Sequence, residues 1–193
     1  MLERLVAFLV FIVIFPVILL LAVVILLTDG RPIFFRQTRV GQFGRDFKIF
    51  KFRSMRNLKG AEQGQFDAGS QSRVTKVGAI LRKTKMDELP QILNVINGTM
   101  SFAGPRPEVR QWVETYPERW ARVHKVKPGI TDPASIRFRN EEALLSAQQN
   151  PQEYYQNVIL PAKLDLYESY IAKKSLGYDL KIIAKTLLSV VKG

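Results

Sequence analysis

An uninterrupted apolar segment dominates the pattern of hydrophobic and polar positions. Residues 5–27 carry no charge, and as a helix these 23 residues extend about 35 Å, enough to cross a bilayer core of about 30 Å. The segment is longer than a signal peptide, and no cleavage site of small residues follows it. Pro16 lies in its middle and predicts a kink. Hydropathy alone favours a spanning helix; a helix that breaks at Pro16 and returns to the same face is the alternative.

Basic residues dominate the region that follows the apolar segment. Residues 31–59 hold nine Lys and Arg side chains and one acid, Asp46, which gives a net charge of +8. Both topologies therefore place this region in the cytoplasm, because positively charged flanks stay on that side of a membrane. We predict a membrane-inserted segment at residues 1–30 and a single cytoplasmic interfacial domain at residues 31–193.

Residues 32–55 favour β-structure on either side of a turn at Gly41-Gln42-Phe43-Gly44, most simply a β-hairpin. Aromatic and basic residues are interleaved here: Phe34, Phe35, Phe43, Phe47, Phe50 and Phe52 with Arg36, Arg39, Arg45, Lys48, Lys51 and Arg53. This pattern is compatible with stacking of single-stranded nucleic acid. Directly after a membrane segment, it favours docking to anionic lipid headgroups.

A basic helix leads into two adjacent carboxylates. Apolar positions between residues 74 and 81 predict a helix, and every charged residue from 73 to 85 is basic. Asp87 and Glu88 follow, and the apolar spacing from Leu89 to Ile96 predicts a short helix that stops at Gly98. A helix start keeps a carboxylate ionised and attracts phosphate, although Asp87 as a simple N-cap is the alternative. The polar, glycine-rich residues 59–72 predict a loop, either a lid or an idle connection.

Two proline-rich turns and a series of helices complete the chain. Pro105 and Pro107 restrict the backbone of Arg106, which suits either a guanidinium that binds a diphosphate or a structural turn with a surface arginine. Residues 127–133 form a second rigid turn, and Arg137 follows it next to an aromatic residue, a weak signal for binding a base and a phosphate. Helices are predicted at residues 108–116, 118–124, 141–149, 151–159, 161–172 and 175–191. The last is amphipathic and either packs on the domain or lies in the membrane interface.

The composition limits the reactive groups that are available in this predicted α+β, mostly helical fold. The 193 residues include no cysteine and a single histidine, His124, which we expect to be a packing or surface residue and not a ligand. Carboxylates, hydroxyls, lysines and arginines are therefore the reactive groups available. The net charge of +12 suits an anionic partner such as nucleic acid, a phosphorylated small molecule or a membrane surface.

Several short motifs follow one another in a specific order. After the apolar segment with its central proline come Phe34-Phe35-Arg36-Gln37-Thr38-Arg39-Val40-Gly41, Lys51-Phe52-Arg53-Ser54-Met55, and Arg82 ahead of Asp87-Glu88-Leu89-Pro90-Gln91. Met100-Ser101, Gly104-Pro105-Arg106-Pro107 and Lys127-Pro128-Gly129-Ile130-Thr131 complete the series. Each motif is weak alone. In this order they resemble, nearly end to end, the small monotopic polyprenyl-phosphate phosphoglycosyl transferases of the bacterial sugar transferase family.

The resemblance implies a membrane enzyme that moves a sugar-1-phosphate from a UDP-sugar to a polyprenyl (undecaprenyl) phosphate and releases UMP. This would be the first membrane step of surface glycan biosynthesis. It also implies a re-entrant membrane helix with both ends in the cytoplasm, amphipathic helices at the membrane interface, and an active site on the cytoplasmic face of the bacterial inner (cytoplasmic) membrane. The implied partners are the two substrates and anionic lipids, not nucleic acid. A homo-oligomer is possible.

Residue roles are carried over with the matched motifs. Asp87 is implied as the nucleophile, which forms a phosphosugar-aspartyl intermediate, and Glu88 as a group that helps to bind Mg²⁺ or manages protons. Asp87 and Glu88 are accordingly the candidate metal ligands. The candidate substrate-binding residues are Arg82, Arg106, Lys51, Arg53 and Arg137.

The chain departs from the family pattern at two places. Phe15 precedes Pro16 where relatives usually carry a serine, and Asp132-Pro133-Ala134-Ser135 replaces a glycine-tryptophan pattern. Two other classes of protein remain as alternatives, a membrane-anchored binding module without chemistry and a nucleic-acid-binding protein. Replacing Asp87 by Asn separates these classes from an enzyme. Binding would persist in either alternative class, whereas an enzyme would lose turnover.

Overall fold

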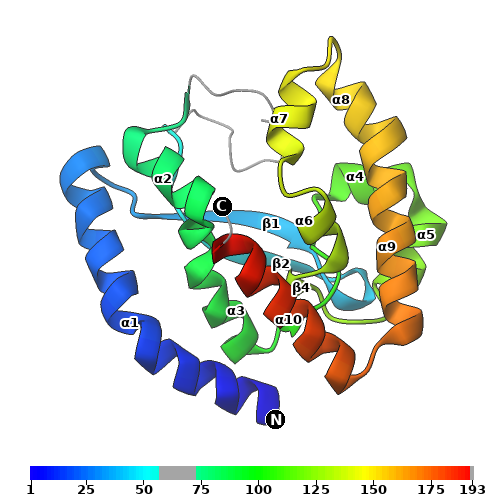
Figure 1. The fold of residues 1–193 in the computed structure, drawn as a ribbon, viewed down its shortest axis with the longest axis horizontal. Coiled ribbons are helices and arrows are strands. Elements are labelled where there is room, and N and C mark those ends of the chain that lie inside the picture. Colours follow the sequence, from blue (N-terminus) through cyan, green and yellow to red (C-terminus); the bar gives the residue numbers. More distant parts are fainter. Residues whose placement is uncertain (57–72, 192–193) are drawn as a thin grey trace.

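The computed structural model describes residues 1–56 and 73–191 and has a mostly helical α+β architecture (Figure 1). The predicted fold class is confirmed at this level. The helices are α1 Leu2–Asp29, α2 Lys76–Thr84, α3 Ile92–Asn97, α4 Arg110–Thr115, α5 Pro117–Val123, α6 Pro133–Arg137, α7 Glu141–Ser146, α8 Pro151–Tyr154, α9 Leu160–Lys173 and α10 Leu176–Val191. The strands are β1 Phe34–Val40, β2 Asp46–Phe52, β3 Ser101–Ala103 and β4 Gly129–Thr131. The loop predicted at residues 59–72 lies outside the described residues.

The apolar segment forms α1, a single helix that continues through Pro16. It is the one helix in the described part of the chain that is long and apolar enough to cross a membrane. Figure 1 shows α1 curving along one side of the domain. Ala7, Ile18 and Ile25 are buried, whereas most of the other apolar side chains of α1 are exposed. An exposed apolar surface of this size indicates association with a membrane.

The first turn of α1 is hydrogen-bonded to the rest of the domain. The carboxylate of Glu3 accepts bonds from Ser101 Oγ (3.1 Å) and from the backbone N–H of Phe102 (2.9 Å). Arg4 Nε donates to the carbonyl oxygen of Ile96 (2.7 Å). The start of the apolar helix is therefore fixed beside β3 and the end of α3.

The last turn of α1 is fixed to the same domain. Arg53 donates to the carbonyl oxygens of Asp29 (2.5 Å) and Gly30 (2.8 Å), and a further bond reaches the carbonyl of Arg31 (2.8 Å). Carbonyl groups at a helix C-terminus have no partner within the helix, so Arg53 caps α1. Thr75 Oγ1 donates to the carboxylate of Asp29 (2.8 Å).

The predicted β-hairpin is confirmed. Strands β1 and β2 pair antiparallel, from Phe34 opposite Phe52 to Val40 opposite Asp46. The connection between them contains a 3-10 turn at Gln42–Gly44, within the predicted turn.

The two adjacent carboxylates lie between α2 and α3. Helix α2 starts at Thr75, whose Oγ1 accepts a bond from the N–H of Gly78 (2.9 Å), and ends at Lys85 in the left-handed conformation (φ 59°). The chain then enters a 3-10 helix, η4 Met86–Gln91, which continues directly into α3. Gly98 (φ 81°) ends α3, as predicted from the sequence.

The hydrophobic pattern does not predict the second sheet, in which β3 and β4 pair in parallel. Glycine is required on both sides of this contact. A Cβ atom on Gly104 would lie 2.5 Å from the carbonyl oxygen of Lys127, and one on Gly129 would lie 2.1 Å from the backbone nitrogen of Gly104. The two proline-rich turns, which are separate in the sequence, therefore pack directly against each other.

The C-terminal helices enclose a large hydrophobic core. Trp120 of α5 and Leu160, Leu164 and Tyr167 of α9 are fully buried in it. The helices predicted at residues 151–159 and 161–172 form one continuous run, because a π-helical turn, η5 Tyr155–Ile159, joins α8 to α9. The prediction of two separate helices was wrong here, and α6 was not predicted.

Helix α10 confirms the predicted C-terminal helix. It packs against β3, β4 and α6, while Leu176, Leu180, Leu187 and Leu188 are exposed. Packing on the domain is therefore observed, and contact of this helix with the membrane stays a prediction. The domain boundary at residue 30 also stays a prediction, although α1 shares a hydrophobic core with the hairpin and α3.

Candidate active site

Asp87 and Glu88 lie in η4 and line a large cleft. Asp87 is 8% exposed. The residue before η4 is Lys85, and no side-chain hydrogen bond caps this helix, so Asp87 does not act as an N-cap. The Asp87 carboxylate accepts no hydrogen bond from the described part of the chain. Asp87 is therefore a partly desolvated carboxylate that is available to react or to bind a cation.

Two cations hold the neighbouring carboxylate of Glu88. Lys51 Nζ donates to Glu88 Oε1 (2.8 Å). Arg106 donates to both oxygens, with Nη1 3.2 Å from Oε2 and Nη2 in contact with Oε1. Lys51 comes from β2 and Arg106 from the loop after β3, so three separate segments meet at this carboxylate. Charge-assisted, bidentate bonds of this kind are among the strongest hydrogen bonds in proteins.

The environments of the two carboxyl groups push their pKa values in opposite directions. Burial raises the pKa of Asp87, and attraction by Lys51 offsets this only in part. Burial also acts on Glu88, but Arg106 and Lys51 outweigh it and hold the pKa of Glu88 well below its usual range. Glu88 is therefore a fixed negative charge at neutral pH, and Asp87 is the carboxylate whose ionisation the site disfavours. Such a separation is characteristic of active sites in which paired carboxyl groups have different roles.

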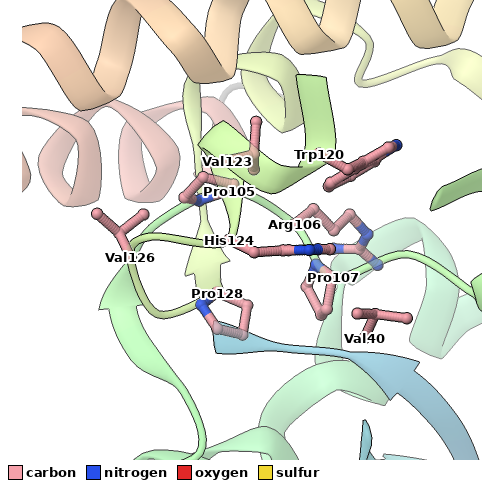
Figure 2. Close-up of a pocket in the computed structure, with 9 residues that line it drawn as sticks. All are labelled: Val40, Pro105, Arg106, Pro107, Trp120, Val123, His124, Val126 and Pro128. Carbon is pink, nitrogen blue, oxygen red and sulfur yellow. The ribbon is translucent and has the colours of Figure 1, made fainter. Parts of the chain in front are cut away.

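The loop at residues 104–107 holds Arg106 against a packed surface. Figure 2 shows Pro105 and Pro107 on either side of Arg106, with Trp120 and His124 lining the same small cavity. At about 10 Å³, that cavity has room for no more than about one water molecule. The ring of His124 stacks on Trp120 with centroids 5.2 Å apart, which confirms the prediction that this histidine has a packing role.

The other predicted substrate-binding residues differ in their placement. Arg82 lines the cleft and donates to Glu142 of α7 (2.8 Å). Arg53 also borders the cleft, but its guanidinium caps α1. The guanidinium of Arg137 lies over the ring of Phe138, 5.7 Å from its centroid, and Arg137 is not among the residues that line the cleft. The structure thus brings Lys51 and Arg106 into contact with Glu88, while Arg82 lines the same cleft, and substrate binding by all five residues stays a prediction.

The cleft has a volume of about 1450 Å³, and its lining changes character from one part to another. Apolar side chains come from α1, the η4–α3 segment, the β3–β4 sheet and α10: Val10, Ile14, Leu89, Ile92, Phe102, Ile130, Ile183 and Leu187. Basic side chains come from α2, from the residues on either side of it and from the segment after β2: Lys76, Lys83, Arg73, Lys85 and Arg56. The cleft can therefore accommodate a ligand that combines anionic groups with an apolar part.

The sequence did not predict that Glu108 lines the cleft. Glu108 lies two residues after Arg106, 6% exposed, and bonds to residues as distant in the chain as Arg39 and Tyr155. A charged residue directly after the Pro-Arg-Pro turn was the one available signal, because its partners come from other segments.

The structure also accounts for the unusual Asp132-Pro133-Ala134-Ser135 sequence. The Asp132 carboxylate accepts bonds from the N–H groups of Ala134 (2.7 Å) and Ser135 (2.9 Å), so it is the N-cap of α6. Pro133 occupies the first turn of the helix, where no N–H is needed. In this chain the departure from the family pattern therefore starts a helix.

Residues 1–193 match the family model described as bacterial sugar transferase. This chain belongs to that family. The resemblance inferred from the motifs is thereby confirmed.

Several curated proteins are similar to this chain over most of its length. The UDP-glucose:undecaprenyl-phosphate glucose-1-phosphate transferase of Escherichia coli strain K12 is 38% identical over 97% of this chain and 38% of its own length. The UDP-N-acetylgalactosamine-undecaprenyl-phosphate N-acetylgalactosaminephosphotransferase of Aeromonas hydrophila is 36% identical over 92% of this chain and 40% of its own length. The uncharacterized sugar transferase EpsL of Bacillus subtilis strain 168 is 35% identical, over 91% and 78%. This chain thus spans about two fifths of the first two relatives.

Proposed function

We propose that this chain is a phosphoglycosyl transferase that moves a sugar-1-phosphate from a UDP-sugar to a membrane polyprenyl phosphate, such as undecaprenyl phosphate, in surface glycan synthesis. The observation that carries the proposal is the Asp87–Glu88 pair, in which one buried carboxylate accepts no bond from the described residues and its neighbour is held by two cations. The names of the relatives support the choice of substrates, since they combine a UDP-sugar with undecaprenyl phosphate.

The proposed reaction has two steps that use the same phosphorus. A carboxylate oxygen of Asp87 attacks the sugar-bearing phosphorus of the donor, and the bond from that phosphorus to the oxygen bridging the two phosphates breaks. UMP leaves with the electron pair. A phosphate oxygen of the polyprenyl phosphate then attacks the phosphosugar-aspartyl intermediate, which forms the lipid diphosphate-sugar and restores the Asp87 carboxylate.

The cations around the pair act on the negative charge of the reacting phosphates. An anionic nucleophile is repelled by a diphosphate, so the site has to supply fixed positive charge. Lys51 and Arg106 are held in position by Glu88, and Arg82 borders the same cleft. We assign Arg106 and Lys51 to the phosphates nearest Asp87, and Arg82 to the outer part of the diphosphate. The raised pKa of Asp87 makes its carboxylate the more basic, and hence more nucleophilic, member of the pair.

The residues present fit a magnesium ion that is shared with substrate. Mg²⁺ in phosphoryl-transfer sites takes one or two carboxylates and completes its shell with phosphate oxygens and water. The Asp87 carboxylate has no hydrogen-bond partner among the residues that the structure describes, and Glu88 keeps lone pairs beyond those used by Lys51 and Arg106. No cluster of three acidic or histidine side chains suited to a metal occurs within residues 1–56 and 73–191. We therefore do not propose a magnesium site whose ligands are all protein side chains. When bound, the ion neutralises charge on the phosphates.

We also propose that α1 is re-entrant, with the active site at the cytoplasmic face of the inner membrane. A straight helix of 28 residues is about 42 Å long and would place one end beyond the far side of the bilayer. Here Glu3 and Arg4 at one end and Asp29 at the other are all bonded to the same domain. Those bonds favour a helix that enters and leaves on one side, and the basic flank at residues 31–59 favours the cytoplasmic side.

UMP release tests the proposed function. The purified chain, in nanodiscs with Mg²⁺, is offered a panel of UDP-sugars with and without undecaprenyl phosphate. We expect sustained release from one donor, dependent on the lipid and lost in Asp87→Asn. Asp165→Asn is the matched control, because that carboxylate is on the surface and 73% exposed. Release that persists in Asp87→Asn, or lipid binding without release from any donor, would contradict the proposal.

A further inference from the structure

A compact group of charged side chains lies in the cleft beyond Arg106. We call it the Glu108 cluster, and it consists of Arg39, Glu108, Glu141, Tyr155 and Lys163. Glu108 is its centre. Its Oε2 accepts from Arg39 Nη1 (3.0 Å), and its Oε1 accepts from the Tyr155 hydroxyl (2.6 Å). Lys163 Nζ lies 3.9 Å from the same Oε1.

The Glu108 cluster is rigid. Lys163 is 5% exposed and reaches the Glu141 carboxylate (2.7 Å) and the Tyr155 hydroxyl (3.3 Å). Its ammonium group also lies 4.8 Å from the centroid of the Tyr155 ring. Side chains with so many partners present their remaining polar atoms in fixed positions, which is what selective recognition of a small ligand requires.

The Glu108 cluster differs in charge from the surroundings of Asp87 and Glu88. In the Glu108 cluster two cations face two carboxylates, so the formal charge is zero. Burial alone would raise the pKa of Glu108, but Lys163 and Arg39 outweigh it and lower that pKa, so this carboxylate is ionised at neutral pH. Around Asp87 and Glu88, by contrast, three cations act on two carboxylates: Lys51, Lys85 and Arg106. The diphosphate of a donor therefore belongs beside Asp87, and a neutral part of the donor belongs at the cluster.

Polar groups with no hydrogen-bond partner in the described part of the chain border the cluster. Gln37 lines the cleft and uses its carbonyl oxygen to accept two bonds from Arg39 (2.7 and 3.0 Å). Its amide NH₂ group makes no hydrogen bond to the described part of the chain. The Asn140 side chain, next to Glu141, also lines the cleft and has no hydrogen-bond partner within residues 1–56 and 73–191. Trp112 packs on Tyr155, with centroids 4.9 Å apart, and supplies an apolar wall.

We propose that the Glu108 cluster, with Gln37 and Asn140, is the subsite that binds the sugar of the donor and decides which UDP-sugar is used. The proposal rests on the proposed function. Donor and acceptor groups in fixed positions beside aromatic rings suit a neutral, polyhydroxylated ring. Such a site discriminates strongly, because a sugar epimer leaves a protein group unpaired.

The connectivity of the donor favours the sugar over the uracil at this place. The sugar is bonded through one oxygen to the phosphorus that Asp87 attacks, so its ring has to lie directly beside the Asp87–Glu88 pair. Uracil is separated from that phosphorus by a second phosphate and a ribose. Glu108 is only two residues from Arg106, and Arg106 contacts Glu88. The Glu108 cluster therefore shares the cleft with Asp87 and starts two residues from an arginine that bonds to Glu88, which is why we place the sugar there.

Donor preference in two variants tests this subsite. Asn140→Ala and Glu141→Gln are chosen because the Asn140 side chain makes no hydrogen bond within residues 1–56 and 73–191 and the Glu141 side chain is 27% exposed, so the fold should tolerate both changes. The kcat/KM for UMP release is measured with UDP-glucose, UDP-galactose, UDP-N-acetylglucosamine and UDP-N-acetylgalactosamine. Inhibition by UMP is measured in parallel. Asp165→Asn is again the control for the loss of an acid, and thermal unfolding checks the fold.

We expect each variant to change the ratio of kcat/KM between the preferred donor and its epimer by about tenfold or more. The inhibition constant of UMP should change less than about twofold, because UMP lacks the transferred sugar that the subsite would bind. A uniform loss of activity with all donors would show a purely structural role and overturn the proposal. Weaker inhibition by UMP in parallel with donor loss would assign the subsite to the nucleotide and overturn it as well. No turnover of any donor by the folded wild-type chain would overturn both proposals.

Discussion

Arg106 donates two hydrogen bonds to the carboxylate of Glu88, 18 positions earlier in the chain. Pro105 and Pro107 restrict the backbone of this arginine, so little conformational freedom is lost when it binds. The pair connects the proline-rich loop to η4. The geometry of the proposed active site depends on this contact.

Arg106→Lys should therefore lower kcat/KM for UMP release by about 100-fold or more, because a lysine cannot reproduce a bidentate contact. Arg110→Lys is the matched control, since Arg110 forms a half-exposed surface pair with Asp46. Steady-state kinetics with the preferred donor provides the measurement. Activity within about threefold of wild type in Arg106→Lys would remove Arg106 from the proposed chemistry.

The pH dependence of kcat/KM should reflect Asp87 and Lys51. Burial raises the pKa of Asp87, so activity should fall on the acid side at a pH above that of an ordinary aspartate. Burial lowers the pKa of Lys51, which should produce a fall on the basic side. In Lys51→Met the acid limb should move to higher pH, because Lys51 holds the pKa of Asp87 down, and the basic limb should weaken. An acid limb that stays in place or moves to lower pH would contradict this assignment.

His124 should make stability depend on pH. Burial lowers the pKa of His124 from 6.5 to about 4, so the unfolded chain binds a proton in this range that the folded chain does not. Folding stability should therefore fall as the pH drops from 6.5 towards 4, by about 3 kcal/mol from this residue. Thermal unfolding of wild type and His124→Phe across this range measures the effect. The variant keeps the ring on Trp120 and should lose less stability. Parallel curves for the two proteins would disprove the role of His124.

The re-entrant placement of α1 predicts that the N-terminal end of the helix lies on the same side of the membrane as the domain that follows it, shielded from the outside of the cell. The sequence has no cysteine, so single substitutions Leu2→Cys and Ser175→Cys give unambiguous labelling sites. Neither should react with a membrane-impermeant maleimide in intact spheroplasts, and both should react after lysis. Labelling of Leu2→Cys from outside would show a spanning helix instead.

Local features of the fold could be predicted from the sequence. The hairpin, the C-terminal helix and the stop at Gly98 depend on neighbouring residues, and the structure confirms them. The pairing of β3 with β4 and the capping of α1 by Arg53 join segments that are distant in the chain, so no periodicity reveals them. Arg53 illustrates the difference: substrate binding, expected from its motif, stays a prediction, whereas only the structure shows that its guanidinium caps α1.

The candidate site was predictable to a similar extent. The sequence singled out Asp87 and Glu88 because two acids follow a purely basic stretch. It could not show that Lys51 and Arg106 both bond to Glu88, since these contacts span 37 and 18 residues. Tertiary packing alone brings Lys163 to Glu108 and so creates the polar part of the cleft.

The central claim, a covalent phosphosugar on Asp87, is tested most directly by mass spectrometry of the intact chain. The protein is mixed with the preferred UDP-sugar and Mg²⁺, without polyprenyl phosphate, and quenched within one turnover. We expect the mass to rise by one sugar phosphate, the peptide that contains Asp87 to carry the addition, and the same quantity of UMP to be released. Adding undecaprenyl phosphate should remove the adduct. UMP release without an adduct, or an adduct on another residue, would contradict the proposed mechanism.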